Sequence, residues 1–161
     1  MGNVSDMRRI DSNLQPAGSI VNTAVTAGGT GDTTAINGAT IDRVTLGERF
    51  SSAMLVISAR ATMASGETLK VTAKFQDSAN DSDWTDYGDA LALTTIVTAI
   101  GGAATAKAGH LKLGVDLTSA RRYVRGVVQP DLSRAGTDTA TIAAVVILGG
   151  ASSTPRAQTS Q

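Results

Sequence analysis

The chain has 161 residues, enough for one domain with a core of its own. It carries 14 Lys and Arg against 14 Asp and Glu, so a general electrostatic grip on nucleic acid is not expected. With no Cys and a single His, His110, the composition excludes disulfide scaffolds, zinc knuckles, cysteine nucleophiles and most triad chemistry. Since 42% of residues are hydrophobic but only 3% are aromatic, we expect a core of Ala, Val, Ile and Leu, typical of a structural protein.

Residues 1–18 form a polar segment of mixed charge that ends on Pro16 and Gly18. They show no helical periodicity and no apolar stretch of the kind found in secretory signals, so we expect an extended N-terminal arm. Ile142–Leu148, the longest apolar run, is far shorter than the ~20 residues needed to span a bilayer, so no membrane partner is expected.

From Ser19 onward the sequence consists of short runs typical of strands, separated by Gly-rich and polar turns. In chain order, strands are expected at Ser19–Val25, Thr40–Leu46, Ala53–Thr62, Thr68–Phe75, Leu91–Val97, Leu111–Leu117, Arg122–Gln129 and Thr139–Leu148. The alternation is clearest in Ala53–Thr62 and Thr68–Phe75, and the short turn at Gly66 between them predicts a β-hairpin with one solvent-exposed face.

About eight strands and no long helix predict an all-β protein, an antiparallel two-sheet sandwich of jelly-roll type. The sandwich domain is expected to span residues 19–150. Residues 151–161 form a polar, low-complexity tail that we expect to be disordered.

Asp77–Asp89 is an acidic loop, and clustered carboxylates are suitable ligands for Ca²⁺. The loop departs from the EF-hand pattern, because the twelfth position is not Glu, whichever Asp starts the count. The alternative, which we favour, is an ordinary loop in which Asp and Asn side chains bond their own backbone.

Trp84 and Tyr87 lie in the same loop and supply much of the aromatic content. Three interpretations are open for them: a platform on which a sugar stacks, an anchor for a protein partner, or a cover over one end of the sandwich.

No enzyme site is indicated. His110 follows Gly109 at an expected strand entrance, without a second His or a paired carboxylate at readable spacing. Gly29 and Gly31 lack the third glycine of a dinucleotide-binding loop, and no P-loop is present. We therefore predict no catalytic, cofactor-binding or metal-binding residues.

Three arginines, Arg121, Arg122 and Arg125, surround Tyr123. A strand would place Arg121, Tyr123 and Arg125 on one face, so that two guanidinium groups flank the ring and could pair with carboxylates of a partner. A solvated strand face is the alternative.

Several segments together resemble small virion proteins of tailed bacteriophages, especially capsid decoration or cement proteins. The resemblance covers roughly residues 41–150. Its segments are Ser52–Ile57, Gly66–Ala73, Gln76–Ser78 with Trp84 and Tyr87–Gly88, Arg122–Arg125 and Val146–Gly150. It implies a β-sandwich dimer or trimer that sits on the outer shell and clamps neighbouring major capsid subunits, with no catalytic residues.

The leading hypothesis is therefore a decoration protein made in the host cytoplasm and located on the outer capsid surface, with the major capsid protein as its partner. The alternatives are a phage tail or head-completion component and a carbohydrate-binding β-sandwich that uses Trp84 and Tyr87.

Two further contact regions are expected. In the arm, Arg8 and Arg9 would bond to acidic shell surface while Met7 and Ile10 serve as apolar anchors. Self-association, with a trimer favoured, is expected through an apolar surface made of Leu91, Leu93, Ile96, Val97 and Val145–Leu148.

Overall fold

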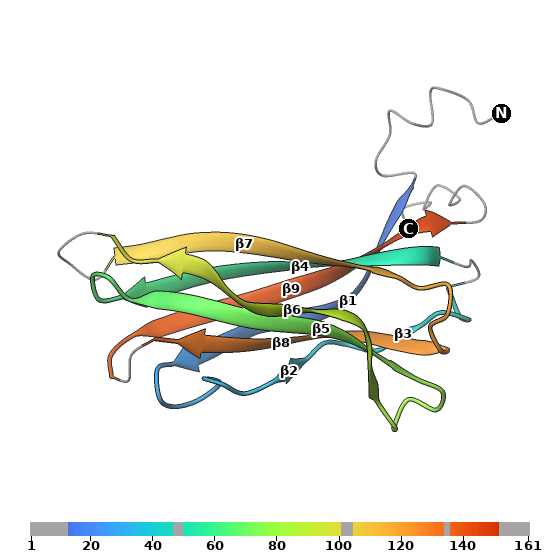
Figure 1. Cartoon of the computed structure of the whole chain (residues 1–161), viewed down its shortest axis with the longest axis horizontal. Helices are drawn as coiled ribbons and strands as arrows, with labels where there is room; N and C mark the ends of the chain where they lie inside the picture. The colour runs from blue at the N-terminus through green and yellow to red at the C-terminus, as the bar shows by residue number, and fades with distance from the viewer. Residues whose placement is uncertain (1–12, 47–49, 101–104, 134–135, 152–161) are drawn as a thin grey trace, which may run out of the picture.

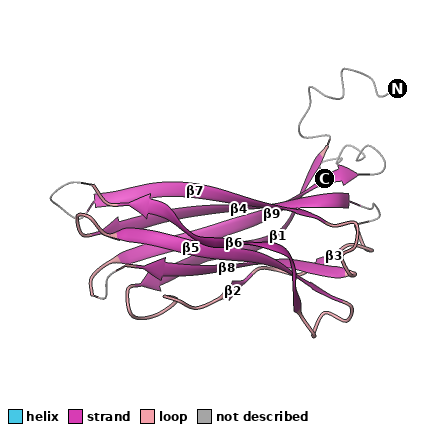
Figure 2. Cartoon of the chain, in the orientation of Figure 1, coloured by secondary structure: helices cyan, strands magenta, loops and turns pink. Residues whose placement is uncertain are grey.

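The computed structural model describes residues 13–46, 50–100, 105–133 and 136–151, and within these ranges it contains strands and no helix (Figure 2). The strands are β1 (Leu14–Thr26), β2 (Ile36–Asn37), β3 (Ile41–Asp42), β4 (Phe50–Met63), β5 (Thr68–Ser78), β6 (Thr85–Thr98), β7 (Thr105–Asp116), β8 (Tyr123–Leu132) and β9 (Thr139–Ala151). No described helix is long and apolar enough to cross a membrane.

The strands form two antiparallel sheets that stack face to face (Figure 1). One sheet has the order β1-β9-β4-β7, and the other has the order β2-β8-β5-β6, with β3 also paired to β8. The pairs are nested around the β5–β6 connection: β4 pairs with β7, β2 and β3 pair with β8, and β1 pairs with β9. A long antiparallel ribbon folded over in this way is a jelly roll, so the predicted fold class is confirmed.

The core lies between the two sheets and follows the period of two in the central strands. On β4 every second residue from Ala53 to Ala61 is buried, and on β5 the buried set runs from Leu69 to Phe75. These two apolar faces point toward each other across the core. Phe75, with no exposed surface, is the largest side chain among those fully buried.

The predicted hairpin between β4 and β5 is wrong, although both strands are present. β4 pairs with β7 and β9, whereas β5 pairs with β6 and β8 in the other sheet. The turn at Gly66 crosses from one sheet to the other, helped by a left-handed backbone at this glycine (φ 86°). Alternation identifies an apolar face on each strand. It is equally compatible with two strands paired side by side in one sheet and with two strands in opposite sheets whose apolar faces meet across the core.

The predicted arm is wrong for its last residues. β1 begins at Leu14 and pairs with β9 from Leu14↔Gly149 to Ala17↔Val146. Pro16 and Gly18, which suggested a break, lie within an edge strand whose register shifts between Ala17 and Ser19, and an edge strand tolerates both residues. Residues 1–12 and 152–161, which contain the remaining arm and the predicted tail, lie outside the described residues.

At each of the two open sides of the sandwich, the two sheets approach each other closely. On one side the Ala39 amide donates to the Ser19 carbonyl of β1 (2.9 Å). On the other side β6 crosses β7 so tightly that a Cβ added at Gly109 would lie 2.0 Å from the Ile96 carbonyl oxygen. The edge strands β6 and β7 therefore cover each other, and β1 is approached by the chain at Ala39.

Candidate functional site

The candidate site is at the end of the sandwich where β1 begins and β9 ends (Figure 1). The β5–β6 and β7–β8 loops also lie at this end. We call it the polar end and define it by the residues whose side chains meet there: Asp42, Arg43, Gln76, Asp77, Trp84, Arg121, Arg122, Tyr123 and Arg125.

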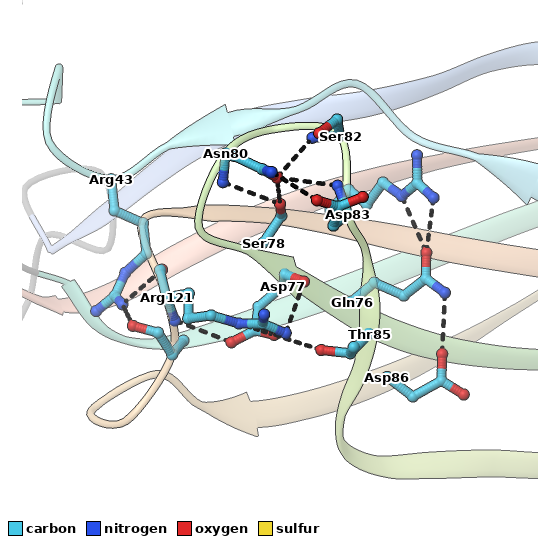
Figure 3. Close-up of polar contacts among 12 residues, drawn as sticks. Arg43, Gln76, Asp77, Ser78, Asn80, Ser82, Asp83, Thr85, Asp86 and Arg121 are labelled. Atoms are coloured by element: carbon cyan, nitrogen blue, oxygen red, sulfur yellow. Dashed lines mark hydrogen bonds and ion pairs between the residues drawn. The ribbon is translucent and has the colours of Figure 1, made fainter.

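An ion pair with a buried carboxylate joins β5 to the β7–β8 loop. Asp77 ends the inward row of β5 and is 4% exposed. Its Oδ1 accepts hydrogen bonds from Nε (2.9 Å) and Nη2 (2.6 Å) of Arg121, and its Oδ2 accepts one from the Arg121 backbone amide (2.9 Å) (Figure 3). Thr85 Oγ1 at the start of β6 donates a further bond to Asp77 Oδ1 (3.2 Å). One carboxylate therefore connects β5, β6 and the β7–β8 loop.

A second pair connects β3 to the same loop. Arg122 donates from Nε (3.1 Å) and Nη2 (2.7 Å) to the two carboxylate oxygens of Asp42. These bonds are the main reason that the pKa of Asp42 is lowered to about 2. For Asp77, burial raises the pKa, but the bonds from Arg121 outweigh burial and the net shift is downward.

These lowered pKa values predict that acid weakens the fold. Both folded-state values are below the ~3.9 of an unfolded Asp, so the stabilisation is fully present above about pH 4 and is lost as the pH falls toward 2. We expect the urea midpoint to decrease over this range, and the decrease to be smaller in Asp77→Asn. Urea titrations at pH 6, 4, 3 and 2.5 measure this; identical pH dependence in the two proteins would contradict it.

The arrangement of the arginines differs from the prediction. Arg121 and Arg125 do not flank Tyr123: Arg121 is bound to Asp77, and the Arg125 guanidinium lies 4.2 Å from the centroid of the Trp84 ring. Arg122, which the strand periodicity places on the other face, lies 4.8 Å from the centroid of Tyr123. The reason is that β8 begins only at Tyr123, so the preceding arginines follow the turn and not the strand alternation.

A chain of hydrogen bonds through Gln76 holds the Arg125 guanidinium in its position over Trp84. Arg125 Nε and Nη2 donate to Gln76 Oε1 (3.0 and 2.8 Å), and Gln76 Nε2 donates to Asp86 Oδ1 (2.9 Å) (Figure 3). Asp86 also accepts from Lys74 Nζ (2.9 Å). The guanidinium is therefore held over the indole, where the cation–π attraction is strongest.

Arg43 is a residue of this end that the sequence did not reveal. Its Nη1 donates to the carbonyls of Ala120 and Arg121 (3.2 Å to the latter), and its Nη2 donates to the Phe50 carbonyl (3.4 Å). It thus joins the β7–β8 loop to the start of β4. Its contact with the β7–β8 loop depends on carbonyls 77 and 78 residues away in sequence, and such contacts leave no local pattern.

The predicted acidic loop Asp77–Asp89 is shorter than expected, since Asp77 belongs to β5 and Asp86 and Asp89 belong to β6. The turn between the strands has the expected side-chain-to-backbone bonds. Asn80 Oδ1 accepts from the amides of Ser82 (3.1 Å) and Asp83 (2.9 Å), as in an Asx-type turn. Its carboxylates have separate partners: Asp77 bonds Arg121, and Asp81 Oδ1 accepts from Thr40 Oγ1 (2.9 Å). In the described part of the chain, no three His, Asp or Glu side chains gather closely enough to hold a metal ion.

The other predicted residues are dispersed. Tyr87 packs against the core, and its hydroxyl donates to the Asp116 carbonyl on β7 (2.9 Å), so Tyr87 does not form a platform with Trp84. His110 lies in the middle of β7 opposite Ser58, not at a strand entrance, and is exposed. Met7, Arg8, Arg9 and Ile10 lie outside the described residues.

The predicted self-association surface is only partly available. On β6, Val97 is buried and Leu91 and Ile96 pack against the core, which leaves Leu93 exposed (50%). In β9, Val146 and Leu148 are buried, while Val145 and Ile147 point outward and are half-buried.

No protein-family model matches the chain, and neither does any curated protein sequence. Solved structures that align with it include a structure of infectious bursal disease virus, Gx strain (10% identity, TM-score 0.41, 88% of this chain and 34% of that one). Another is the PBSX exported protein XepA (18% identity, TM-score 0.39, 92% of this chain and 41% of that one). A third is the enzymatically active domain of bacteriophage CBA120 tailspike protein 4 (15% identity, TM-score 0.36, 89% of this chain and 20% of that one). The chain spans well under half the length of each. Likenesses of this size carry no information on function.

Proposed function

We propose that this chain is a structural virion protein that decorates a bacteriophage capsid and stabilises it by clamping neighbouring major capsid subunits. The resemblance of its sequence to phage decoration proteins suggests this role. The polar end supports the proposed role, because it offers a surface suited to contact with the shell.

The observation that carries the proposal is the pair of arginine–aromatic stacks held rigidly at one end. Arg125 covers Trp84, and Arg122 covers Tyr123. Trp, Tyr and Arg are the residues that dominate the binding energy of protein interfaces, and side chains already fixed in place lose less entropy on binding. The stacks also argue against a sugar platform, because a guanidinium already occupies one face of the Trp84 ring.

The N-terminal segment extends this contact. Residues 1–12 lie outside the described residues, and β1, which follows them in the chain, begins at the polar end. A chain of twelve residues can span at most about 40 Å at ~3.3 Å per residue, which is enough to reach a neighbouring subunit. A second attachment point raises the overall affinity through effective concentration.

A matched pair of loop variants tests the proposal. Ser82 is exposed in the β5–β6 loop of the polar end, and Ser65 is exposed in the β4–β5 turn at the opposite end (Figure 1). We expect Ser82→Trp to weaken binding to undecorated shells of the parent phage at least tenfold, about 1.4 kcal/mol, because the added ring separates the surfaces. Ser65→Trp should bind like the unmodified chain.

The measurement is a titration of the full chain onto shells, followed by co-sedimentation. If the unmodified chain does not bind shells, the proposed function is wrong. If all three proteins bind equally, the polar end is not the contact surface.

A further inference from the structure

We propose that the outer face of the β1-β9-β4-β7 sheet binds a second copy of this chain, sheet against sheet, around a two-fold axis parallel to the strands. This inference does not depend on the proposed function, since it concerns the free protein.

The outer sheet face carries an apolar strip across three strands. In the register of the sheet, Met54 of β4 lies between Ile147 of β9 and Gly114 of β7, and Val56 lies between Val145 and Lys112. These apolar side chains point away from the core and are only half-buried. In the described part of the chain, no element packs over them. The strip consists of Pro16, Met54, Val56, Ala143, Val145 and Ile147.

The outer face of the other sheet is chemically different. Polar residues of β5 lie beside polar residues of β8 on this face, as in Thr72↔Gln129 and Gln76↔Arg125. Lys74 forms an ion pair with Asp86 (2.8 Å) on the same face. That face offers few apolar side chains for a second sheet to cover. The two outer faces of the sandwich therefore differ, and the apolar one is suited to burial.

The distribution of charge favours a second copy as the occupant. β1 and β9 contain no charged residue at all, whereas β4 and β7 contribute the outward cations Arg60 and Lys112. A two-fold axis running between β9 and β4 places β4 of one copy over β9 of the other, and β7 over β1. Each Lys112 then faces an uncharged strand, and no like charges meet.

The area is sufficient for a stable dimer. The β4–β9 ladder extends from Phe50 to Thr62, which is about 40 Å at ~3.4 Å per residue, and four strands about 4.8 Å apart are about 19 Å wide. The face therefore measures about 800 Å², close to the ~800 Å² that each partner buries in a standard interface. Aligned sheet packing of this kind is the geometry that two sheets adopt within a sandwich.

Because the chain contains no Cys, single-cysteine variants provide a clean test. Val145→Cys places a thiol on the outer sheet face near the axis, and Thr72→Cys places one on the opposite face as the control. We expect a short bis-maleimide to convert Val145→Cys to covalent dimer at about 50 µM and to leave Thr72→Cys monomeric on denaturing gels. Sedimentation equilibrium of the full chain should show a dimer, which Val145→Glu weakens at least tenfold and Thr72→Glu leaves unchanged.

Far-UV circular dichroism of Val145→Glu checks that the variant is folded, and the cross-link gives an answer even if it is not. A monomer or a trimer at this concentration would overturn the proposal, since a sheet face that stacks on itself closes at two copies. Equal cross-linking at both positions would overturn the assignment to this face. Binding of Val145→Cys to shells without any dimer in solution would indicate that the face binds another protein, and would also overturn it.

Discussion

Gly109→Ala should destabilise the protein by about 3 kcal/mol, toward the upper end of the range for overpacking. The Cβ would lie 2.0 Å from the Ile96 carbonyl oxygen and 3.0 Å from its carbon, and both are backbone atoms that cannot rotate away. β6 must therefore move away from β7, which opens one side of the sandwich. In a chain of this size, the loss corresponds to a decrease in melting temperature of about 6–12 °C.

Gly114→Ala is the matched control, because it makes the same change on the same strand. Nothing lies within 4 Å of a Cβ at this position. We expect its free energy of unfolding to stay within about 0.5 kcal/mol of the unmodified protein. Urea unfolding of the three proteins measures both effects. Equal stability of the two variants would show that the β6–β7 crossing is not a rigid constraint.

The sequence predicted the strands because burial on one face imposes a period of two, which is visible locally. Every expected strand range overlaps a strand of the structure. β2 was not expected, since Ile36–Asn37 is too short to show any period. Pairing was harder to predict: the β4–β5 turn joins two sheets, and the alternation on either side of it would be the same in a hairpin. The short turn between β4 and β5 favoured a hairpin. In the structure the two strands lie in different sheets, because this buries their apolar faces against each other.

The candidate site was predicted less well, for a related reason. Trp84 and the arginines of residues 121–125 gather at one end, although the sequence suggested them as two separate candidates. Which arginine meets which ring depends on where β8 begins, and a shift of one residue reverses the faces. Arg121 lies 44 residues from Asp77, and Ala120 lies 77 residues from Arg43, so no local spacing could indicate these two contacts.

Asp77→Ala should cost about 2 kcal/mol, a decrease in melting temperature of about 4–8 °C. Asp77 is almost fully buried, and its carboxylate accepts bonds from the side chain and amide of Arg121 and from Thr85. Its removal leaves the Arg121 amide without this acceptor and frees the β7–β8 loop. We place the cost below that of a fully buried pair because the Arg121 side chain is 40% exposed and water can solvate it.

Asp86→Ala is the control for this prediction, since it also removes an aspartate bonded to a cation. The Lys74–Asp86 pair is exposed (37% and 61%), and exposed pairs contribute little to stability. We therefore expect Asp86→Ala to leave the urea midpoint nearly unchanged at pH 7. Arg121→Met should lower the midpoint in the unmodified chain but have little further effect in Asp77→Ala, because the two residues act as one unit. Additive losses in the double variant would show that Asp77 and Arg121 stabilise the polar end independently, and that the ion pair is not what holds its loops together.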